Sequence, residues 1–316
     1  MSTRTRESAS ALHAVFPKDR WFETSDGTRI AYTVVGHGTG TPVVFMNGWT
    51  CSDAYWKRIG PAVVEAGHPA VFFDTRGHGQ SGVPRAPGLF AKNLTRDDVS
   101  VRRVATDIIE LLDDAGLDRA ALAGHSMGVQ GIFEAYRVAP ERIAALIPIA
   151  GTYENPVPTF ADKPVLDRLF PIGNALLTRV PFALLKPAMS QAHRMPPEFG
   201  MKVIRTILRT SPEVTYEDVE AHVRQIGDVD FSVLWRMMAE MREHSAADVL
   251  PTITIPVLVL GGERDHFTPP FVQHRMHEAI PDSELVLFPE GGHLLPVEEA
   301  EGIVTHIVDF LARRVP

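Results

Sequence analysis

The chain has 316 residues, 45% hydrophobic and 22% charged, which is an ordinary globular composition. Its net charge of −8 argues against nucleic acid as a partner, because phosphate binding requires clustered Lys and Arg. The single cysteine, Cys51, excludes an intramolecular disulfide framework and a cysteine-rich metal site. No apolar run approaches the ~20 residues that span a bilayer, and no hydrophobic signal segment precedes residue 20. We therefore expect a cytoplasmic protein, with residues 1–17 as a flexible extension.

The first part of the chain alternates predicted strands and helices. Ser25-Asp26-Gly27-Thr28 supplies turn chemistry for a hairpin between the first two strands. A long amphipathic helix follows, with Thr95 as its expected N-cap and Gly116 at its end. The expected strands cover residues 18–24, 29–35, 42–46 and 69–73, with a helix over 53–66.

Gly124-His125-Ser126-Met127-Gly128 lies between an apolar strand pattern and a helical one. A sharp strand-to-helix turn strains its central residue, and side chains two positions away would clash with the strand or helix. Glycine removes the offending Cβ atoms, so Gly124 and Gly128 suit this geometry. The turn exposes the Ser126 hydroxyl beside a helix N-terminus, whose partial positive charge favours a developing oxyanion.

Strands and helices alternate again towards the C-terminus. The fold class predicted is α/β, with a mostly parallel central sheet flanked by helices on both faces and an antiparallel hairpin at its start. The expected strands cover residues 144–150, 255–260 and 284–288, and the expected helices cover 270–279 and 297–311.

The alternation stops over residues 152–247, which show helical periodicity and no convincing strand. We interpret this stretch as a helical cap inserted between two parts of one core domain, residues 18–151 and 248–316. Phe231, Trp235 and Met238 fall near one helical face, and with Trp49 they are the candidate substrate-binding residues. The stretch also holds six of the ten methionines, which adapt to irregular apolar ligands. Any one of them is explained by the core of the insert itself, but as a group they outnumber what one thin helical layer needs.

A serine hydroxyl needs a base to take its proton and an acid to orient that base. In open parallel sheets such groups lie beyond the carboxyl ends of the strands. Asp265 and His293 each follow a predicted strand by a short glycine-led loop, so both are placed to join Ser126. Glu154, after the strand that follows the serine, is an alternative acid.

The chain resembles the α/β-hydrolase-fold proteins of the serine esterase, lipase and C–C hydrolase type over residues 18–311, apart from the detail of the insert. The resemblance rests on the Ser126 pentapeptide, Asp74-Thr75-Arg76-Gly77-His78-Gly79-Gln80-Ser81, Gly262-Glu263-Arg264-Asp265-His266-Phe267-Thr268-Pro269, and Gly291-Gly292-His293. The order Ser126, Asp265, His293 is the order of that family's triad.

The resemblance also implies an oxyanion hole made of two backbone N–H groups. One belongs to Met127, directly after the nucleophile, and the other to Trp49 in the loop after the third strand. This family usually has a His-Gly pair before the second donor, and here Asn47 replaces that histidine. Because the donor is a backbone amide, we expect the hole to survive this difference.

Four neighbouring residues are assigned supporting roles. We expect His125 to point away from the catalytic base, Asp74 and Arg76 to hold their glycine-rich turn, and Cys51 to be a small buried residue.

The resemblance implies a serine hydrolase that cleaves a carboxylic ester of a small to medium apolar substrate through an acyl-enzyme, with no metal or organic cofactor. The same triad also serves C–C bond hydrolysis of diketones and thioesterase, lactonase or perhydrolase activity. A ligand receptor with this fold is an alternative of a different class. We expect no nucleic-acid partner and no membrane span, and the sequence leaves the oligomeric state open.

Overall fold

The computed structural model describes residues 15–84, 94–162, 198, 201–202, 204–205, 210–226 and 231–315. The first 14 residues of the predicted N-terminal extension and residues 163–197 of the predicted cap lie outside the described residues. Phe16, near the end of that extension, stacks on Phe72 of the core with ring centroids 3.8 Å apart.

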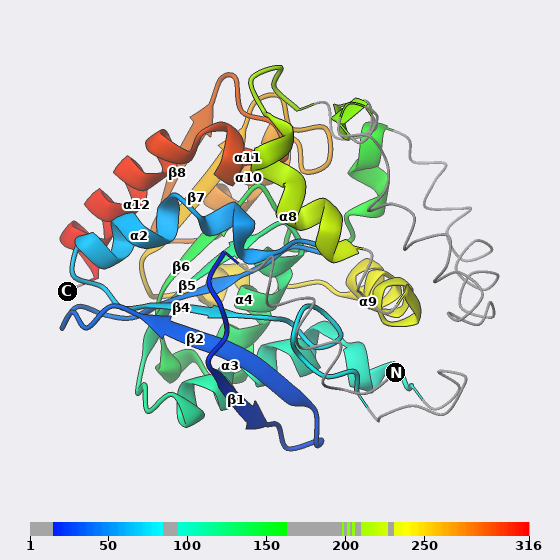
Figure 1. Ribbon diagram of the computed structural model, residues 1–316. Coiled ribbons are helices and arrows are strands. Elements are labelled where there is room, and N and C mark those ends of the chain that lie inside the picture. The colour runs from blue at the N-terminus through cyan, green and yellow to red at the C-terminus, as the bar shows by residue number, and fades with distance from the viewer. Residues whose placement is uncertain are drawn as a thin grey trace.

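One eight-stranded sheet forms the centre of the molecule, in the order β1-β2-β4-β3-β5-β6-β7-β8 (Figure 1). The pairs β1–β2 and β2–β4 are antiparallel, and every other neighbouring pair is parallel. The strands are β1 (Arg20–Glu23), β2 (Arg29–Val35), β3 (Val43–Met46), β4 (Ala70–Phe73), β5 (Ala120–His125), β6 (Ile143–Ile149), β7 (Val257–Gly262) and β8 (Ser283–Phe288).

Helices cover both faces of this sheet, as the sequence predicts (Figure 1). The α-helices are α2 (Ile59–Glu65), α3 (Val101–Asp114), α4 (Met127–Val138), α8 (Tyr216–Ile226), α9 (Phe231–Glu243), α10 (Pro270–Ala279), α11 (Leu295–Glu298) and α12 (Ala300–Arg314). Short 3₁₀ helices are η1 (Asp53–Trp56), η2 (Asp97–Val99), η3 (Pro140–Arg142), η4 (Val157–Asp162) and η6 (Leu250–Thr252).

Alternate residues of the central strands face two separate cores. In β3, Val44 and Met46 pack with α3, α4 and α10, whereas Val43 and Phe45 pack with η1, α2 and α12. All four side chains are buried because both faces of a parallel sheet are covered. The short apolar runs of the sequence therefore become strands at the middle of a three-layer structure.

The start of α3 differs from the sequence-based expectation. Thr95 does not cap this helix; its amide and hydroxyl both donate to Asp98, in the 3₁₀ turn η2. Ser100 is the N-cap instead, and its hydroxyl accepts from the amide of Arg103 at 3.1 Å. An acidic side chain three residues after Thr95 thus stabilises a separate turn before the helix.

The buried side of α9 also differs from the predicted stripe. Val233, Leu234, Met237 and Met241 are buried, whereas Trp235 and Met238 are only half-buried. The side chain of Phe231 lies outside what the structure describes. The apolar residues of this helix spread over an arc wider than the face that is buried, so periodicity alone does not fix which of them face the core.

Within the described residues, no helix has both the length and the apolar composition to cross a membrane.

Arg76, in the loop after β4, joins three parts of the fold. Its side chain is fully buried and makes two hydrogen bonds to Asp107 of α3, of 2.7 and 2.6 Å. It also bonds Asp26 in the β1–β2 turn at 2.7 Å and the carbonyl of Asp98 at 2.7 Å. Asp74 accepts from the amide of Gln80 and thereby holds the same loop, as expected.

We predict that Arg76→Met destabilises the protein strongly, because it leaves the buried carboxylate of Asp107 without its main partner. Removing one member of a buried ion pair typically costs about 3–5 kcal/mol. Urea unfolding should report this loss, and the exposed control Arg264→Ala, which breaks the pair with Glu290, should cost less than about 1 kcal/mol. Equal losses in the two variants would contradict the role of this network.

Candidate active site

Ser126 lies at a strained turn between β5 and α4. Its backbone φ of 54° and ψ of −113° are values that few residues other than glycine adopt. A Cβ at Gly124 would lie 2.5 Å from the carbonyl oxygen of Gly128, and a Cβ at Gly128 would lie 2.6 Å from that of Met46. Strand, turn and helix therefore approach closely only because both glycines lack a side chain. The pentapeptide pattern forms the turn that the sequence predicts.

Asp265 follows β7 and is 98% buried, with three donors around its carboxylate. The amides of Phe267 and Thr268 donate to Oδ1 at 2.7 and 2.9 Å, and the Thr268 hydroxyl donates to Oδ2 at 2.6 Å. Burial by itself raises the pKa of Asp265, but His293 and the Thr268 donors outweigh it and hold the pKa below its ordinary value. The carboxylate is therefore ionised at neutral pH.

His293 follows β8 and lies between the other two side chains. Its Nδ1 is 3.0 Å from Asp265 Oδ2, and its Nε2 is 3.1 Å from Ser126 Oγ. The Phe267 ring stacks on the imidazole, with ring centroids 4.8 Å apart. An ionised carboxylate only accepts, so Nδ1 carries the proton and Nε2 is free to accept one from the hydroxyl. The structure thus brings the three predicted residues into one hydrogen-bonded chain.

The loop after β3 lies directly against this serine. A Cβ at Gly48 would lie 3.0 Å from Ser126 Cβ, so the main chain of this loop passes beside the nucleophile candidate. Trp49 comes next, and its indole N–H donates to the carbonyl of Leu234 in α9 at 2.9 Å. Met127 is the first residue of α4, where backbone N–H groups have no partner within the helix. Met127 and the loop that carries Trp49 therefore both lie next to Ser126 in the fold.

Asn47 has a structural partner that the sequence pattern does not reveal. Its side-chain oxygen accepts a hydrogen bond from the indole N–H of Trp56 in η1 at 2.7 Å, and both residues are buried. A buried indole N–H requires an acceptor. The bond ties the loop after β3 to η1, which explains how this loop is supported without the family's usual histidine.

His125 does not point away from the base, contrary to expectation. Its ring centroid is 5.3 Å from that of His293, and its Nε2 is 2.9 Å from the main-chain oxygen of His293.

Cys51 is buried as expected, and burial raises the pKa of its thiol to about 12. The thiol therefore stays protonated and has the properties of a small apolar group.

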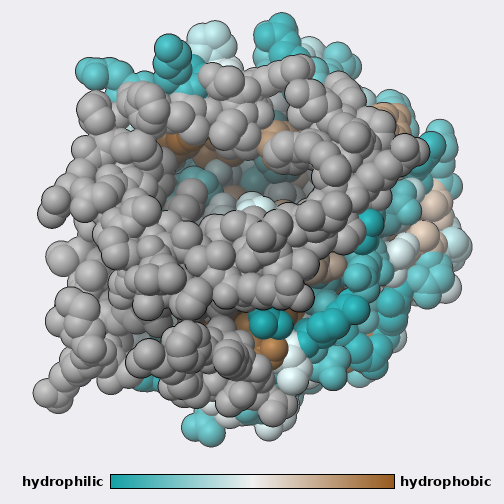
Figure 2. All heavy atoms as spheres, turned by 90° about the vertical axis from the view of Figure 1, so that its right-hand side faces the viewer, coloured by the Kyte–Doolittle hydropathy of each residue, from teal (hydrophilic) through white to brown (hydrophobic). Residues whose placement is uncertain are grey.

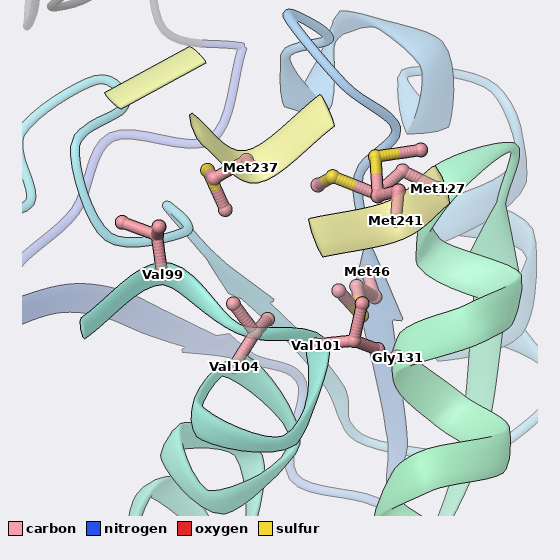
Figure 3. Close-up of a pocket in the computed structure, with 8 residues that line it drawn as sticks. All are labelled: Met46, Val99, Val101, Val104, Met127, Gly131, Met237 and Met241. Carbon is pink, nitrogen blue, oxygen red and sulfur yellow. The ribbon is translucent and has the colours of Figure 1, made fainter. Parts of the chain in front are cut away.

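Candidate substrate-binding residues lie where α9 meets the core. Trp49 and Trp235 contact edge to face, with ring centroids 6.1 Å apart. A small apolar pocket nearby, which Figure 3 shows, has a cavity volume of about 10 Å³, which is room for about one water molecule. Its lining residues are Met46, Val99, Val101, Val104, Met127, Gly131, Met237 and Met241.

Four of these eight lining residues are methionines, whose flexible side chains adapt in shape. Two of them, Met237 and Met241, come from the predicted cap, whereas Trp235 and Met238 do not line this pocket. Among the residues that Figure 2 colours, hydrophobic ones are visible on this face beside hydrophilic ones.

Comparison with known proteins gives one consistent family. The model of the alpha/beta hydrolase family matches residues 43–306. A protein from Variovorax paradoxus, provisionally named a carbamate hydrolase, is 26% identical over 89% of this chain and 96% of its own. Among solved structures, a thermophilic esterase from Thermogutta terrifontis has a TM-score of 0.67 and 24% identity, covering 93% of this chain and 98% of its own. An enol-lactonase from Burkholderia xenovorans has a TM-score of 0.69 and 19% identity, covering 93% of this chain and all of its own.

The family model spans both the strand that precedes the Asn47 loop and the loops that carry Ser126, Asp265 and His293. The chain belongs to the alpha/beta hydrolase family of enzymes.

Proposed function

We propose that this protein is a serine hydrolase that cleaves carboxylic esters through an acyl-enzyme on Ser126. The observation that carries the proposal is the chain of hydrogen bonds from Asp265 through His293 to Ser126. A hydroxyl becomes a useful nucleophile when an oriented base can take its proton, and this geometry supports that role for His293.

In the first half-reaction, Ser126 Oγ attacks the ester carbonyl carbon while its proton moves to His293 Nε2. The ionised Asp265 stabilises the imidazolium that forms, and the amides of Trp49 and Met127 donate to the oxyanion. Collapse of the tetrahedral intermediate breaks the bond to the alcohol oxygen. The alcohol leaves with the proton from His293, and the acyl group stays on Ser126.

In the second half-reaction, water attacks the acyl carbon and His293 takes the water proton. The second tetrahedral intermediate breaks its bond to Ser126 Oγ, which recovers its proton from His293. The carboxylic acid is released and the enzyme is restored. In this proposed cycle His293 relays both protons, the first from Ser126 to the alcohol and the second from water to Ser126, and main-chain amides make the oxyanion contacts.

We propose that the substrates carry small to medium apolar acyl groups and that the segment between β6 and β7 acts as a cap over them. Trp49, Trp235 and the methionines of α9 put apolar surface beside the core, and the side chain of Trp49 is held by α9. Two of the similar solved structures are named as an esterase and an enol-lactonase, and a lactone is a cyclic ester.

Product analysis on a panel of acyl esters, lactones, thioesters and diketones separates ester cleavage from the other reactions of this triad. Steady release of acid and alcohol from simple esters would also separate an enzyme from a ligand receptor of this fold. Binding without turnover of any panel member would contradict the proposal.

We predict that Ser126→Ala lowers kcat by about 10⁴-fold or more, because it removes the nucleophile. A fluorophosphonate probe should label the wild type at Ser126 and fail on the variant. The matched control is Ser245→Ala, at an exposed serine after α9, which should keep both activity and labelling. Undiminished labelling of Ser126→Ala would assign the nucleophile to another residue.

We predict that Asp265→Asn lowers kcat by about 10⁴-fold, because an amide no longer stabilises the required tautomer and the imidazolium of His293. Glu154, the alternative acid, is the matched control. Burial, and next to it the Glu154 carboxylate, raise the pKa of Tyr153, so Glu154 lies beside Tyr153. Asp265, in contrast, contacts His293. Steady-state kinetics of Asp265→Asn and Glu154→Gln should show a large loss only in the first variant. The reverse order would move the acid to Glu154.

We predict that kcat/KM rises along an ester series from acetyl towards medium acyl chains. Each buried methylene contributes up to about 0.8 kcal/mol, or roughly fourfold. Trp235→Ala should flatten the rise, whereas Phe271→Ala, which removes an exposed ring from α10, should leave it unchanged. A flat or falling profile in the wild type would argue against an apolar acyl pocket.

A further inference from the structure

The main chain around His293 is held at two adjacent points by side chains outside the triad. Its own carbonyl oxygen is 2.9 Å from Nε2 of His125. The amide of Gly292, the preceding residue, donates to Oε2 of Glu298 at 2.7 Å. These bonds fix the backbone that carries the imidazole rather than the imidazole itself. They are independent of the contacts to Asp265 and Ser126.

The bond from His125 requires a defined form of that side chain. A carbonyl oxygen only accepts, so Nε2 of His125 must carry a proton. Burial lowers the pKa of His125 to about 3, and the nearby His293 adds to this effect, so the ring is neutral at the pH of an esterase assay. Its Nδ1 is then an acceptor, and it is buried without a partner in the described structure. A buried unpaired acceptor is unfavourable, so a histidine here costs stability that an apolar residue would not.

His125 is also the residue directly before Ser126. The hydrogen bond to His293 therefore connects the strand that carries the nucleophile to the loop that carries the base. The ring stacks on Tyr55 of η1, with centroids 5.1 Å apart, and this packing limits its rotation. The distance between Ser126 and His293 therefore depends partly on the side chain of His125.

Glu298 holds the loop from the other side. Its second oxygen, Oε1, accepts from the amide of Ser211 at 2.8 Å, in the segment that leads into α8. A Cβ at Gly292 would lie 3.0 Å from Oε2, so glycine is what lets this amide approach the carboxylate closely. The carboxyl is mostly buried, and burial raises its pKa although both amide donors act in the opposite direction. One carboxylate therefore joins the base loop to part of the proposed cap.

We propose that His125 and Glu298 are positioning residues that hold the main chain of His293 in register with Ser126. This inference rests on the proposed function, because it assigns their role through His293 as the base. Displacing a catalytic group by about 1 Å can cost about 10²-fold in rate, so two main-chain hydrogen bonds are enough to matter. Both residues act through His293, and the transferred proton does not pass through either of them.

A matched pair of variants tests His125. The amide nitrogen of glutamine reaches the position of Nε2, whereas that of asparagine stops near Nδ1. His125→Gln should keep kcat within about threefold of the wild type, and His125→Asn should lower it tenfold or more with KM unchanged. Rates are divided by the fraction of sites that a fluorophosphonate titrates, and melting curves identify temperatures at which both variants are folded.

Equal kcat values for the two His125 variants would overturn its positioning role. If the fluorophosphonate labels neither variant in the standard assay, prolonged labelling at lower temperature gives the rate of Ser126 modification for each. The proposal then requires that His125→Gln is labelled faster than His125→Asn. Failure of the wild type to label at Ser126 would instead contradict the proposed function itself.

Glu298→Gln tests the other contact, with the exposed Glu301→Gln of α12 as its control. The groups that face His293 are Asp265 from the β7–α10 loop, neutral His125 from β5, Ser126 directly after β5, and Glu298 from α11. Removing one negative charge from this set disfavours the imidazolium. The acid limb of the kcat/KM profile should therefore move to lower pH by at least a few tenths of a unit.

The same variant should also lower kcat per titrated site by threefold or more, because Gly292 and Ser211 donate to different oxygens of Glu298 and glutamine has an acceptor oxygen at only one of the two positions. A merely structural role would lower the melting temperature without moving the pH profile. An unchanged acid limb, or equal shifts in Glu298→Gln and Glu301→Gln, would overturn the positioning role of Glu298.

Discussion

The close approach of three glycine-bearing segments around Ser126 is the constraint on which the site depends. A residue held in this region of φ and ψ costs about 1–3 kcal/mol, so its surroundings must compensate for the strain. Contacts of 2.5 and 2.6 Å to hypothetical Cβ atoms at Gly124 and Gly128 show how little room the turn leaves. Any side chain at either position would push β5, β3 or α4 apart and move the hydroxyl away from the base.

The parallel sheet converts that local turn into a site. β5, β6, β7 and β8 are consecutive neighbours, so the loops after β5, β7 and β8 meet at one edge although they are far apart in sequence. Asp265 and His293 need only short loops to reach Ser126. A Cβ at Gly262 would lie 2.2 Å from the carbonyl oxygen of Gly291, so a further close backbone contact brings the acid and base loops together.

The features predictable from sequence are those with a local or periodic cause. Apolar runs bounded by glycine identify the central strands, and the α10 helix over Pro270–Ala279 agrees with its predicted bounds. The three members of the hydrogen-bonded chain were recognisable because each follows a strand in the order typical of the family. Their catalytic roles stay predictions until activity is measured.

What the sequence does not predict depends on tertiary contacts. The Asn47–Trp56 bond joins side chains on separate elements, and no spacing rule signals it. The capping of α3 by Ser100 instead of Thr95 depends on Asp98 accepting from Thr95. The contacts of His125 and Glu298 are to main-chain atoms, which leave no complementary residue type in the sequence.

The electrostatics of the site follow from the same burial that makes it precise. Asp265 stays ionised because four hydrogen-bonding contacts stabilise its charge, including one with His293. His125 stays neutral because it is buried beside another imidazole. The ionised Asp265, the base His293 and the neutral His125 therefore lie close together without competing for the same proton.

Rapid-quench kinetics with an activated ester, followed by mass spectrometry of the quenched protein, tests the central claim most directly. The account predicts a burst of alcohol approaching one equivalent per site and a matching acyl adduct on the peptide that contains Ser126. Ester turnover with a linear time course and no adduct would be consistent with slow acylation, so the experiment is repeated with a slowly deacylating carbamoylating ester. Absence of any adduct at Ser126 from that reagent, or an adduct on a different residue, would contradict the account.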